Sequence, residues 1–313
     1  MEFKKIYESD FDQVIPLLRK FDTELGGEKS KLLFKKNWCV SIDFCGVAIA
    51  DNNEIIAYLG LFFSDRIING KSCIFCNLSS LIIDERYRGQ KLSHKIIQYL
   101  QSLGDFSLTA ITPIPSLYKM YSSNGFISLD DFRTILWKYP FAQSSQKFSL
   151  LSNYSEIQNY LNVNELKIFT DHKYFNCRIL LFKTDNDYAL LIIKNKSSQR
   201  KKFLTSKPIN YINWFTLKFF EYSFLDSVMI CPEVHYCSNY KFFINNIAHF
   251  STKYFSQYPK YTCFCLRSDF AKMYQLKYPL KSNFRHSRQM FFSRSLPPES
   301  YDTLYSEIFV LDM

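Results

Sequence analysis

Residues 81–97 read LIIDERYRGQKLSHKII. An apolar run is followed by a short charged turn, and a helical pattern begins at about residue 89. A helix N-terminus has unpaired N–H groups and partial positive charge, which suit a phosphate. Gly89 allows close backbone approach, and Arg86 and Arg88 offer charge-assisted hydrogen bonds. The stretch therefore fits either a pyrophosphate-binding turn or an ordinary strand-to-helix connection with solvated arginines.

The elements around this turn predict a mixed sheet with helices. Their order is β-α-α-β-β-β-α-β-α-β, and the strand before the turn is apolar for several residues running, as in a central strand. The predicted elements are strand 2–7, a helix from Ser9–Asp10, a helix at 28–37, a hairpin around Asp51–Asn53, strand 72–84, a helix at 89–102, strand 106–112, a helix at 116–123 and further strands to Trp137.

The second half of the chain repeats this order after a linker at 139–147. We therefore expect an α+β protein of two similar domains, 1–140 and 148–313, each a mixed, mostly antiparallel sheet flanked by helices. The elements predicted there are a helix at 154–161, a hairpin around 185–187, strand 226–231, a helix at 238–256, strand 261–267, a helix at 268–276, strand 288–293 and a final strand at 301–312.

The composition indicates a folded protein with a large core. The chain has 313 residues, of which 47% are hydrophobic, and this excludes a disordered chain. The net charge of +10 attracts anions in general, whether nucleic acid, an acidic membrane surface or a phosphate-rich cofactor. The nearest basic cluster, 199–202, is typical of a solvated turn, and no nucleic-acid motif accompanies it. We therefore expect no nucleic-acid partner.

Further patterns favour a cytoplasmic protein. The N-terminus lacks the pattern of a signal peptide, and the apolar stretch 212–230 is broken by Lys218, Glu221 and Asp226, so no stable membrane insertion is expected. Nine cysteines, an odd number, favour reduced thiols.

Two cysteine pairs have short spacings. Cys73 and Cys76 form a C-x-x-C, and Cys263 and Cys265 a C-x-C. Both pairs lie in apolar, strand-like runs without neighbouring histidines, so they read as small buried hydrophobic residues. No metal is expected.

Residues 83–93 resemble motif A of the GNAT superfamily, the acyl-CoA-dependent N-acyltransferases. Its pattern is Arg/Gln-x-x-Gly-x-Gly/Ala, and the step Tyr87-Arg88-Gly89 matches well, whereas Lys91 and Ser93 replace small residues. Downstream, KMYSSNGF at 119–126 resembles the family's Phe-Tyr-x-x-x-Gly-Phe. The resemblance covers about residues 1–138.

This resemblance implies where an acyl-CoA binds. The strand before the turn would splay from its neighbour and leave a slot in which the pantetheine arm pairs with the backbone of Leu81, Ile82 and Ile83, and a backbone N–H there would polarise the thioester carbonyl. A family asparagine that holds the pantetheine arm is replaced by Ile114, so that hydrogen bond would be absent or supplied by Thr112. The cofactor-binding residues implied at the turn are Arg86, Arg88, Gly89, Gln90, Lys91, Leu92 and Ser93.

The resemblance also implies a catalytic acid. Tyr121 falls on the family tyrosine that protonates the departing CoA thiolate, and a packing role on the sheet is the alternative. The general base is left open, because Asp43, Glu85 and His94 each read as ordinary surface residues. In the second half, the lone His235 reads as a loop residue.

The leading hypothesis is an acyl-CoA-dependent acyltransferase. It would move an acyl group, with acetyl as the expected one, to an amine of a small molecule or nucleotide-linked amino sugar by direct attack on the thioester. A faint likeness to bacterial GNAT proteins with long C-terminal halves is the reason for the sugar. The C-terminal half lacks the turn and would shape the acceptor pocket or hold a homodimer. The alternatives are a tandem transferase that uses aminoacyl-tRNA and a catalytically inactive GNAT-fold binding protein.

Overall fold

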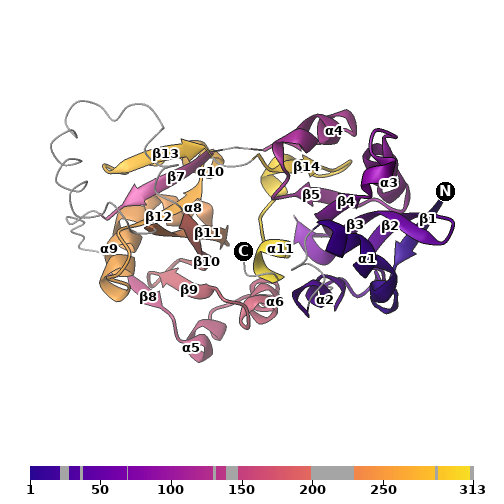
Figure 1. Cartoon of the computed structure of the whole chain (residues 1–313). Coiled ribbons are helices and arrows are strands. Elements are labelled where there is room, and N and C mark those ends of the chain that lie inside the picture. The colour runs from indigo at the N-terminus through magenta and orange to yellow at the C-terminus, as the bar shows by residue number, and fades with distance from the viewer. Residues whose placement is uncertain are drawn as a thin grey trace. The chain divides into compact units, whose positions relative to one another are not determined.

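The computed structural model describes residues 1–21, 28–35, 38–68, 70–129, 132–138, 147–198, 229–285 and 288–310. The chain forms two compact units, one of residues 1–129 and 287–313 and the other of residues 130–286. Each unit contains its own seven-stranded mixed sheet, as the sequence predicted (Figure 1).

The first unit contains the segment with the charged turn. Its elements are β1 (Glu2–Ile6), η1 (Glu8–Asp10), α1 (Phe11–Phe21), α2 (Glu28–Lys35), β2 (Gly46–Asp51), β3 (Glu54–Ile68), β4 (Lys71–Ile83), η3 (Glu85–Tyr87), α3 (Leu92–Ser102), β5 (Ser107–Ala110), η4 (Pro115–Leu117), α4 (Tyr118–Ser123), β6 (Ile127–Ser128), β14 (Met290–Phe292), η7 (Pro298–Ser300) and α11 (Glu307–Val310).

The second unit repeats this architecture. Its elements are β7 (Phe132–Trp137), β8 (Ser149–Leu151), α5 (Tyr154–Gln158), α6 (Val163–His172), β9 (Arg178–Lys183), β10 (Tyr188–Ser198), β11 (Met229–Cys237), α8 (Tyr240–Asn245), α9 (Ile247–Gln257), β12 (Cys263–Arg267), α10 (Ser268–Met273) and β13 (Lys281–Arg285).

The two sheets have the same topology with one strand exchanged. The first runs β1-β2-β3-β4-β5-β14-β6, and the second, read from its other edge, runs β8-β9-β10-β11-β12-β7-β13. β7 therefore lies between β12 and β13, and β14 between β5 and β6. The predicted ranges 1–140 and 148–313 differ from these units at both strands, because β7 pairs with β12 and β13 of the second sheet and β14 pairs with β5 and β6 of the first.

Local signals in the sequence explain the strands that lead to the turn. Asn52 and Asn53 both have positive φ, +49° and +65°, as a two-residue hairpin between β2 and β3 requires. β3 and β4 then form the longest antiparallel pair of the sheet. This pair carries the chain from the hairpin to the charged turn.

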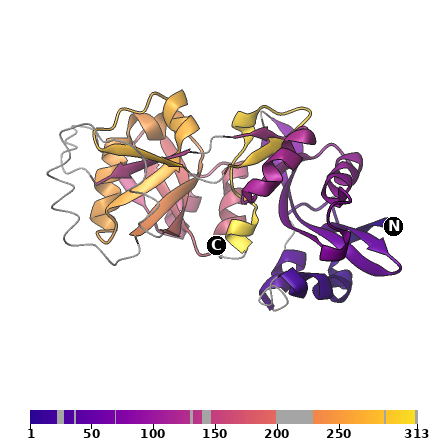
Figure 2. The same cartoon turned by 45° about the horizontal axis from the view of Figure 1, so that its top comes forward.

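Helices cover both faces of the first sheet (Figures 1 and 2). α3 buries Ile96, Ile97 and Leu100 against one face, in the same apolar cluster as residues of α4. α1 and α2 pack against β3, and on this side the ring of Phe34 stacks on Tyr58. The turn at 84–91 thus links a central strand to a helix with a well-packed apolar face.

The C-terminal segment is wrongly predicted as a strand. Residues 301–312 contain the short helix α11, and the backbone N–H groups of Phe309 and Val310 donate to the carbonyl of Ser306. The segment packs within the first unit: Arg66 on β3 forms an ion pair with Asp302 that is mostly buried. The alternation of apolar residues suggested a strand, but short-range hydrogen bonds close a helical turn instead.

Several expectations concern residues outside the described ranges. These are most of the linker at 139–147, the basic cluster 199–202 and most of the apolar stretch 212–230. In the parts of the chain that the structure describes, no helix has both the length and the apolar character needed to cross a membrane.

The exchanged strand β14 gives a first prediction. Phe291 is 1% exposed and packs with Phe75, Ile111 and Tyr301, so Phe291→Ala should destabilise the protein by about 3–5 kcal/mol. Phe3→Ala, at a 40% exposed phenylalanine of the same sheet, is the control and should cost much less. Thermal unfolding of both variants is the measurement, and equal losses would contradict the placement of β14.

Candidate functional site

The turn after β4 is shaped by backbone conformation. Asp84 caps η3, its Oδ1 accepting from the backbone N–H of Arg86 at 3.0 Å. Gly89 follows with φ +84°, and Lys91 is left-handed with φ +58°. An added Cβ at Gly89 would meet no atom within 4 Å, so glycine is required there for its positive φ. α3 then begins at Leu92 without a side-chain cap.

Five successive N–H groups at this turn are available to a ligand. Among the described residues, no acceptor is found for the N–H groups of residues 89–93. Left-handed residues next to ordinary ones are typical of the nests of N–H groups that hold anions, and the start of α3 adds the positive end of a helix dipole. The turn can therefore bind a phosphate through its backbone.

Arg86 is engaged in local ion pairs. Its guanidinium donates to Asp84 at 3.0 Å and to Glu54 Oε1 at 2.7 Å, and Lys20 Nζ donates to Asp84 at 2.8 Å. The hydrogen bonds from Arg86 and Lys20 hold the pKa of Asp84 well below its usual range. These contacts tie the turn to the β2–β3 hairpin, so Arg86 is positioned to brace the turn.

The other predicted side chains of the turn differ in exposure. Arg88 is 61% exposed, and its ion pair with Glu85, at 2.9 Å, is on the surface and easily exchanged for a phosphate. Gln90 and Lys91 are exposed, and Ser93 is half-buried. Leu92 is buried in the core, so it can offer only its N–H. Arg88, Gln90 and Lys91 are the side chains free to reach an anion.

β4 and β5 separate just before this turn. Their parallel register joins residues 75–77 to residues 107–109, and within the described chain it ends there. β4 continues to Ile83 paired with β3, with a bulge where Ser80 has φ +27°. Leu81, Ile82 and Ile83 therefore follow the end of the pairing with β5, as the predicted slot requires.

Tyr121 lies on α4 in the apolar cluster against which Leu81 and Ile83 of β4 pack. Its side chain is buried, and its ring packs against Phe126 with centroids 5.0 Å apart. Burial and the nearby carboxyl of Glu307 raise the pKa of the Tyr121 hydroxyl above its usual value. The tyrosine therefore keeps its proton at neutral pH.

Glu307 was missed by the sequence analysis. It lies on α11, is 3% exposed, and its Oε1 accepts from the hydroxyl of Thr112 at 2.7 Å. Its Oε2 is buried without a hydrogen-bond partner among the described residues. Burial raises the pKa of Glu307 to about 7. A single glutamate in a segment predicted as a strand carries no signal by which it could have been found.

Asp43, Glu85 and His94 were weighed from the sequence as general bases, and all three belong to the first unit. Asp43 and Glu85 are exposed. His94 is half-buried, and its Nδ1 lies 3.0 Å from the side-chain amide nitrogen of Asn124. The hydroxyl of Thr112, a residue predicted to bind the pantetheine arm, donates to Glu307, and Ile114 is exposed.

The corresponding turn of the second unit is closed by its own side chain. After β11, Asn239 caps α8 by accepting from the N–H of Phe242 at 3.0 Å. His235, expected in a loop, is buried in β11 opposite a register shift in β10. The turn at residues 84–91 of the first unit differs from it, because α3 begins there without a side-chain cap.

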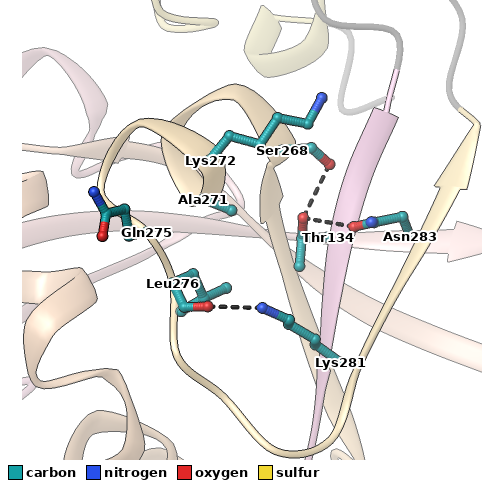
Figure 3. A pocket seen from close by; sticks show the side chains of 8 residues that line it. All are labelled: Thr134, Ser268, Ala271, Lys272, Gln275, Leu276, Lys281 and Asn283. Atoms are coloured by element: carbon teal, nitrogen blue, oxygen red, sulfur yellow. Dashed lines mark hydrogen bonds between the residues drawn. The ribbon is translucent and has the colours of Figure 1, made fainter.

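The second unit also contains a pocket of about 340 Å³ (Figure 3). It lies between α10, β7 and β13, where Thr134 bonds to Ser268 and Asn283 and Lys281 donates to the carbonyl of Leu276. None of these lining residues was predicted from the sequence. The polar groups visible in Figure 3 largely bond to one another.

The buried carboxyl of Glu307 makes a testable prediction about stability. A folded-state pKa of about 7, against an ordinary value of 4.5, means that the folded protein holds the proton more tightly, so stability falls as pH rises from about 4.5 to 7. Glu307→Gln removes this loss and should be more stable than the wild type at pH 8, by up to about 3 kcal/mol. Denaturant unfolding at pH 5 and pH 8 tests this; a difference independent of pH would contradict it.

Comparisons with known proteins agree with this architecture. A crystal structure of a GCN5-related N-acetyltransferase from Anabaena variabilis covers 93% of this chain and 72% of its own, with a TM-score of 0.52 and 11% identity. A probable N-acyltransferase of unknown function from Enterococcus faecalis V583 gives the same coverage, with a TM-score of 0.53 and 8% identity.

Sequence similarity is confined to a shorter segment. The uncharacterized N-acetyltransferase YhbS of Escherichia coli K12 is 31% identical over 78 residues, which are 24% of this chain and 46% of that protein, about half its length. No family model matches the chain. At the level of the fold, the predicted resemblance is confirmed: this chain has the fold of the GCN5-related N-acetyltransferases, the GNAT superfamily.

Proposed function

We propose that this protein is an acyl-CoA-dependent acyltransferase that transfers an acyl group, most simply acetyl, to an amine of a small molecule or nucleotide-linked amino sugar. The observation that carries the proposal is the run of residues 89–93, whose successive N–H groups have no acceptor among the described residues and stand at the start of α3. Such a turn suits a pyrophosphate, and Arg88 and Lys91 add positive charge.

The strands next to the turn suit the rest of an acyl-CoA. β4 passes the end of its pairing with β5 at Asn77, so the backbone from Leu81 to Ile83 is placed to pair with an extended pantetheine arm. The arm would extend the sheet in the way that peptides do when they bind at a free strand edge. A backbone N–H near the bulge at Ser80 would polarise the thioester carbonyl.

In the proposed reaction the amine attacks the thioester directly. The C–N bond forms as the C–S bond breaks, and the thiolate leaves with the electron pair of the C–S bond. Tyr121 keeps its proton at neutral pH and is the acid that protonates this thiolate. The assignment rests on the place of Tyr121 in the same apolar cluster as Leu81 and Ile83 of β4 and on the resemblance of residues 119–126 to the family motif.

The second unit is proposed to have no acyl-CoA site of its own. Asn239 satisfies the start of α8 from within the chain, whereas α3 has no such cap. The roles that remain for this unit are to shape the acceptor pocket or to hold a homodimer.

Two observations favour other functions. The net charge of +10 suits a transferase that uses aminoacyl-tRNA. The engagement of Arg86 with Asp84 and Glu54 suits a GNAT-fold protein that has lost catalysis and binds another ligand. Calorimetric titration with acetyl-CoA, CoA and longer acyl-CoAs separates these functions. Micromolar binding supports the proposal, and absence of binding to all of them would favour one of the alternatives.

Gly89 allows conformation and charge to be tested separately. Gly89→Glu should weaken acetyl-CoA binding by roughly 100-fold or more, because like charges placed together cost several kcal/mol. Gly89→Ala should weaken it by about tenfold or less, because alanine meets no neighbour there and pays only the roughly 1–2 kcal/mol of left-handed strain. Calorimetry on both variants is the measurement, and normal binding by Gly89→Glu would exclude a pyrophosphate at this turn.

Removal of the Tyr121 hydroxyl tests the proposed acid. Tyr121→Phe should lower kcat by about 100-fold or more, while the Kd for acetyl-CoA stays within about twofold, since general acids contribute factors of this size. Tyr99→Phe, at a half-buried tyrosine of α3, is the control and should keep full activity. If both variants turn over at the wild-type rate, Tyr121 has a packing role.

A further inference from the structure

We propose that Glu307, supplied by the C-terminal segment, is the general base that takes the proton from the attacking amine. The inference rests on the proposed acyl transfer and names the group that this reaction still requires. Glu307 lies about 215 residues after the turn in sequence but belongs to the same unit.

Glu307 lies close to the end of β5. The hydroxyl of Thr112 holds Glu307 Oε1 at 2.7 Å, and Thr112 comes two residues after the end of β5, the strand that borders the slot. Tyr121 is on the other face of the sheet, in the cluster that contains Cys76 and Leu78 of β4. The two groups thus approach the end of the β4–β5 pairing from opposite faces, and the carboxyl of Glu307 is near enough to raise the pKa of Tyr121.

The packing of the C-terminal segment establishes the face. Phe75 of β4 packs with Ile111 and with Tyr301 of this segment, and successive side chains of a strand point to opposite faces. Phe75 therefore faces the C-terminal segment, whereas Cys76 faces α3 and α4. The reactive carbonyl of a thioester in the slot would lie between these faces.

One carboxylate oxygen of Glu307 is an unsatisfied acceptor. Glu307 Oε2 is buried and has no hydrogen-bond partner in the described parts of the chain. A buried acceptor without a partner costs about 1–3 kcal/mol. An amine N–H would satisfy this oxygen, so the site gains a hydrogen bond when an acceptor amine binds there.

The face of the first sheet that is turned toward the C-terminal segment also carries polar side chains. Asn77 and Ser79 alternate with the core residues of β4, and both are almost fully buried. The side-chain amide of Asn77 donates to Thr109 Oγ1 at 3.1 Å, but its Oδ1 has no partner among the described residues. A purely structural core would hold apolar side chains here, whereas these polar groups can orient a polar acceptor.

The neighbouring charges do not neutralise Glu307. α2 packs against α11, and its described charged side chains are Lys31 and Lys35. In the C-terminal segment, Asp302 is paired with Arg66. The raised pKa of Glu307 comes from its burial, and the hydrogen bond from Thr112 opposes the rise.

The proposed step balances in protons and electrons. As the amine nitrogen bonds to the thioester carbon, Glu307 accepts one N–H proton, and the C–S electron pair leaves with the thiolate, which Tyr121 protonates. The products are an amide and CoA thiol. Glu307 then loses its proton to solvent and Tyr121 regains one.

The test is a pH–rate profile with acetyl-CoA and methoxyamine, an amine that is unprotonated throughout the range. The wild-type kcat should rise from pH 5.5 to 9 as Glu307 loses its proton. Glu307→Gln should lower kcat by about 100-fold or more at pH 7.5 and remove this rise. Thr112→Val removes the bond that favours the charged carboxylate, so it should move the rise to higher pH.

Controls distinguish this proposal from the proposed function. Glu8→Gln, at an exposed glutamate of the same unit, should leave the profile unchanged. Calorimetry should give the same Kd for acetyl-CoA in the wild type and Glu307→Gln. If acetyl-CoA binds and Glu307→Gln keeps the wild-type rate and profile, Glu307 is not the base. If no acyl-CoA binds to the wild type, the proposed function fails as well.

Discussion

The hydrogen bonds between β4 and β5 reach from residue 75 to residue 77 on β4, and the arrangement of the site depends on where they end. Parallel strands that stay paired would leave no place for a third extended chain between them. Beyond Asn77, β4 follows β3 alone and delivers the turn at residues 84–91 to the start of α3. The open strand edge and the open helix start therefore lie in sequence one after the other.

The two units show how a small local difference changes what a common fold can bind. In both, a bulge or register shift precedes a turn that leads into a helix. In the second unit Asn239 satisfies the helix start itself, and in the first Gly89 and Lys91 adopt left-handed conformations and leave the N–H groups available. Because an anion and a capping side chain compete for the same donors, the uncapped start of α3 suits an anion better than the capped start of α8.

The C-terminal segment completes the first unit in two ways. β14 lies between β5 and β6 in the first sheet, whereas β7, the strand that follows β6 in the sequence, belongs to the second sheet. The residues that follow bring Glu307 to Thr112 at the end of β5. A polar, partly unsatisfied cluster in this position is costly for stability, as is common where a protein keeps a functional group.

The sequence by itself determined the local structure: the hairpin at Asn52–Asn53, the apolar strand that ends at Ile83, and the glycine turn into α3. These follow from periodicity and backbone preferences, which act over a few residues. Tertiary structure alone decided the exchange of β7 and β14, because the partner strands of each lie far away in the sequence, at residues 263–285 for β7 and at residues 107–128 for β14. It also decided that Arg86 pairs with Glu54, and that Glu307 lies buried beside Thr112. Such contacts join residues up to about 200 positions apart, and no local pattern encodes them.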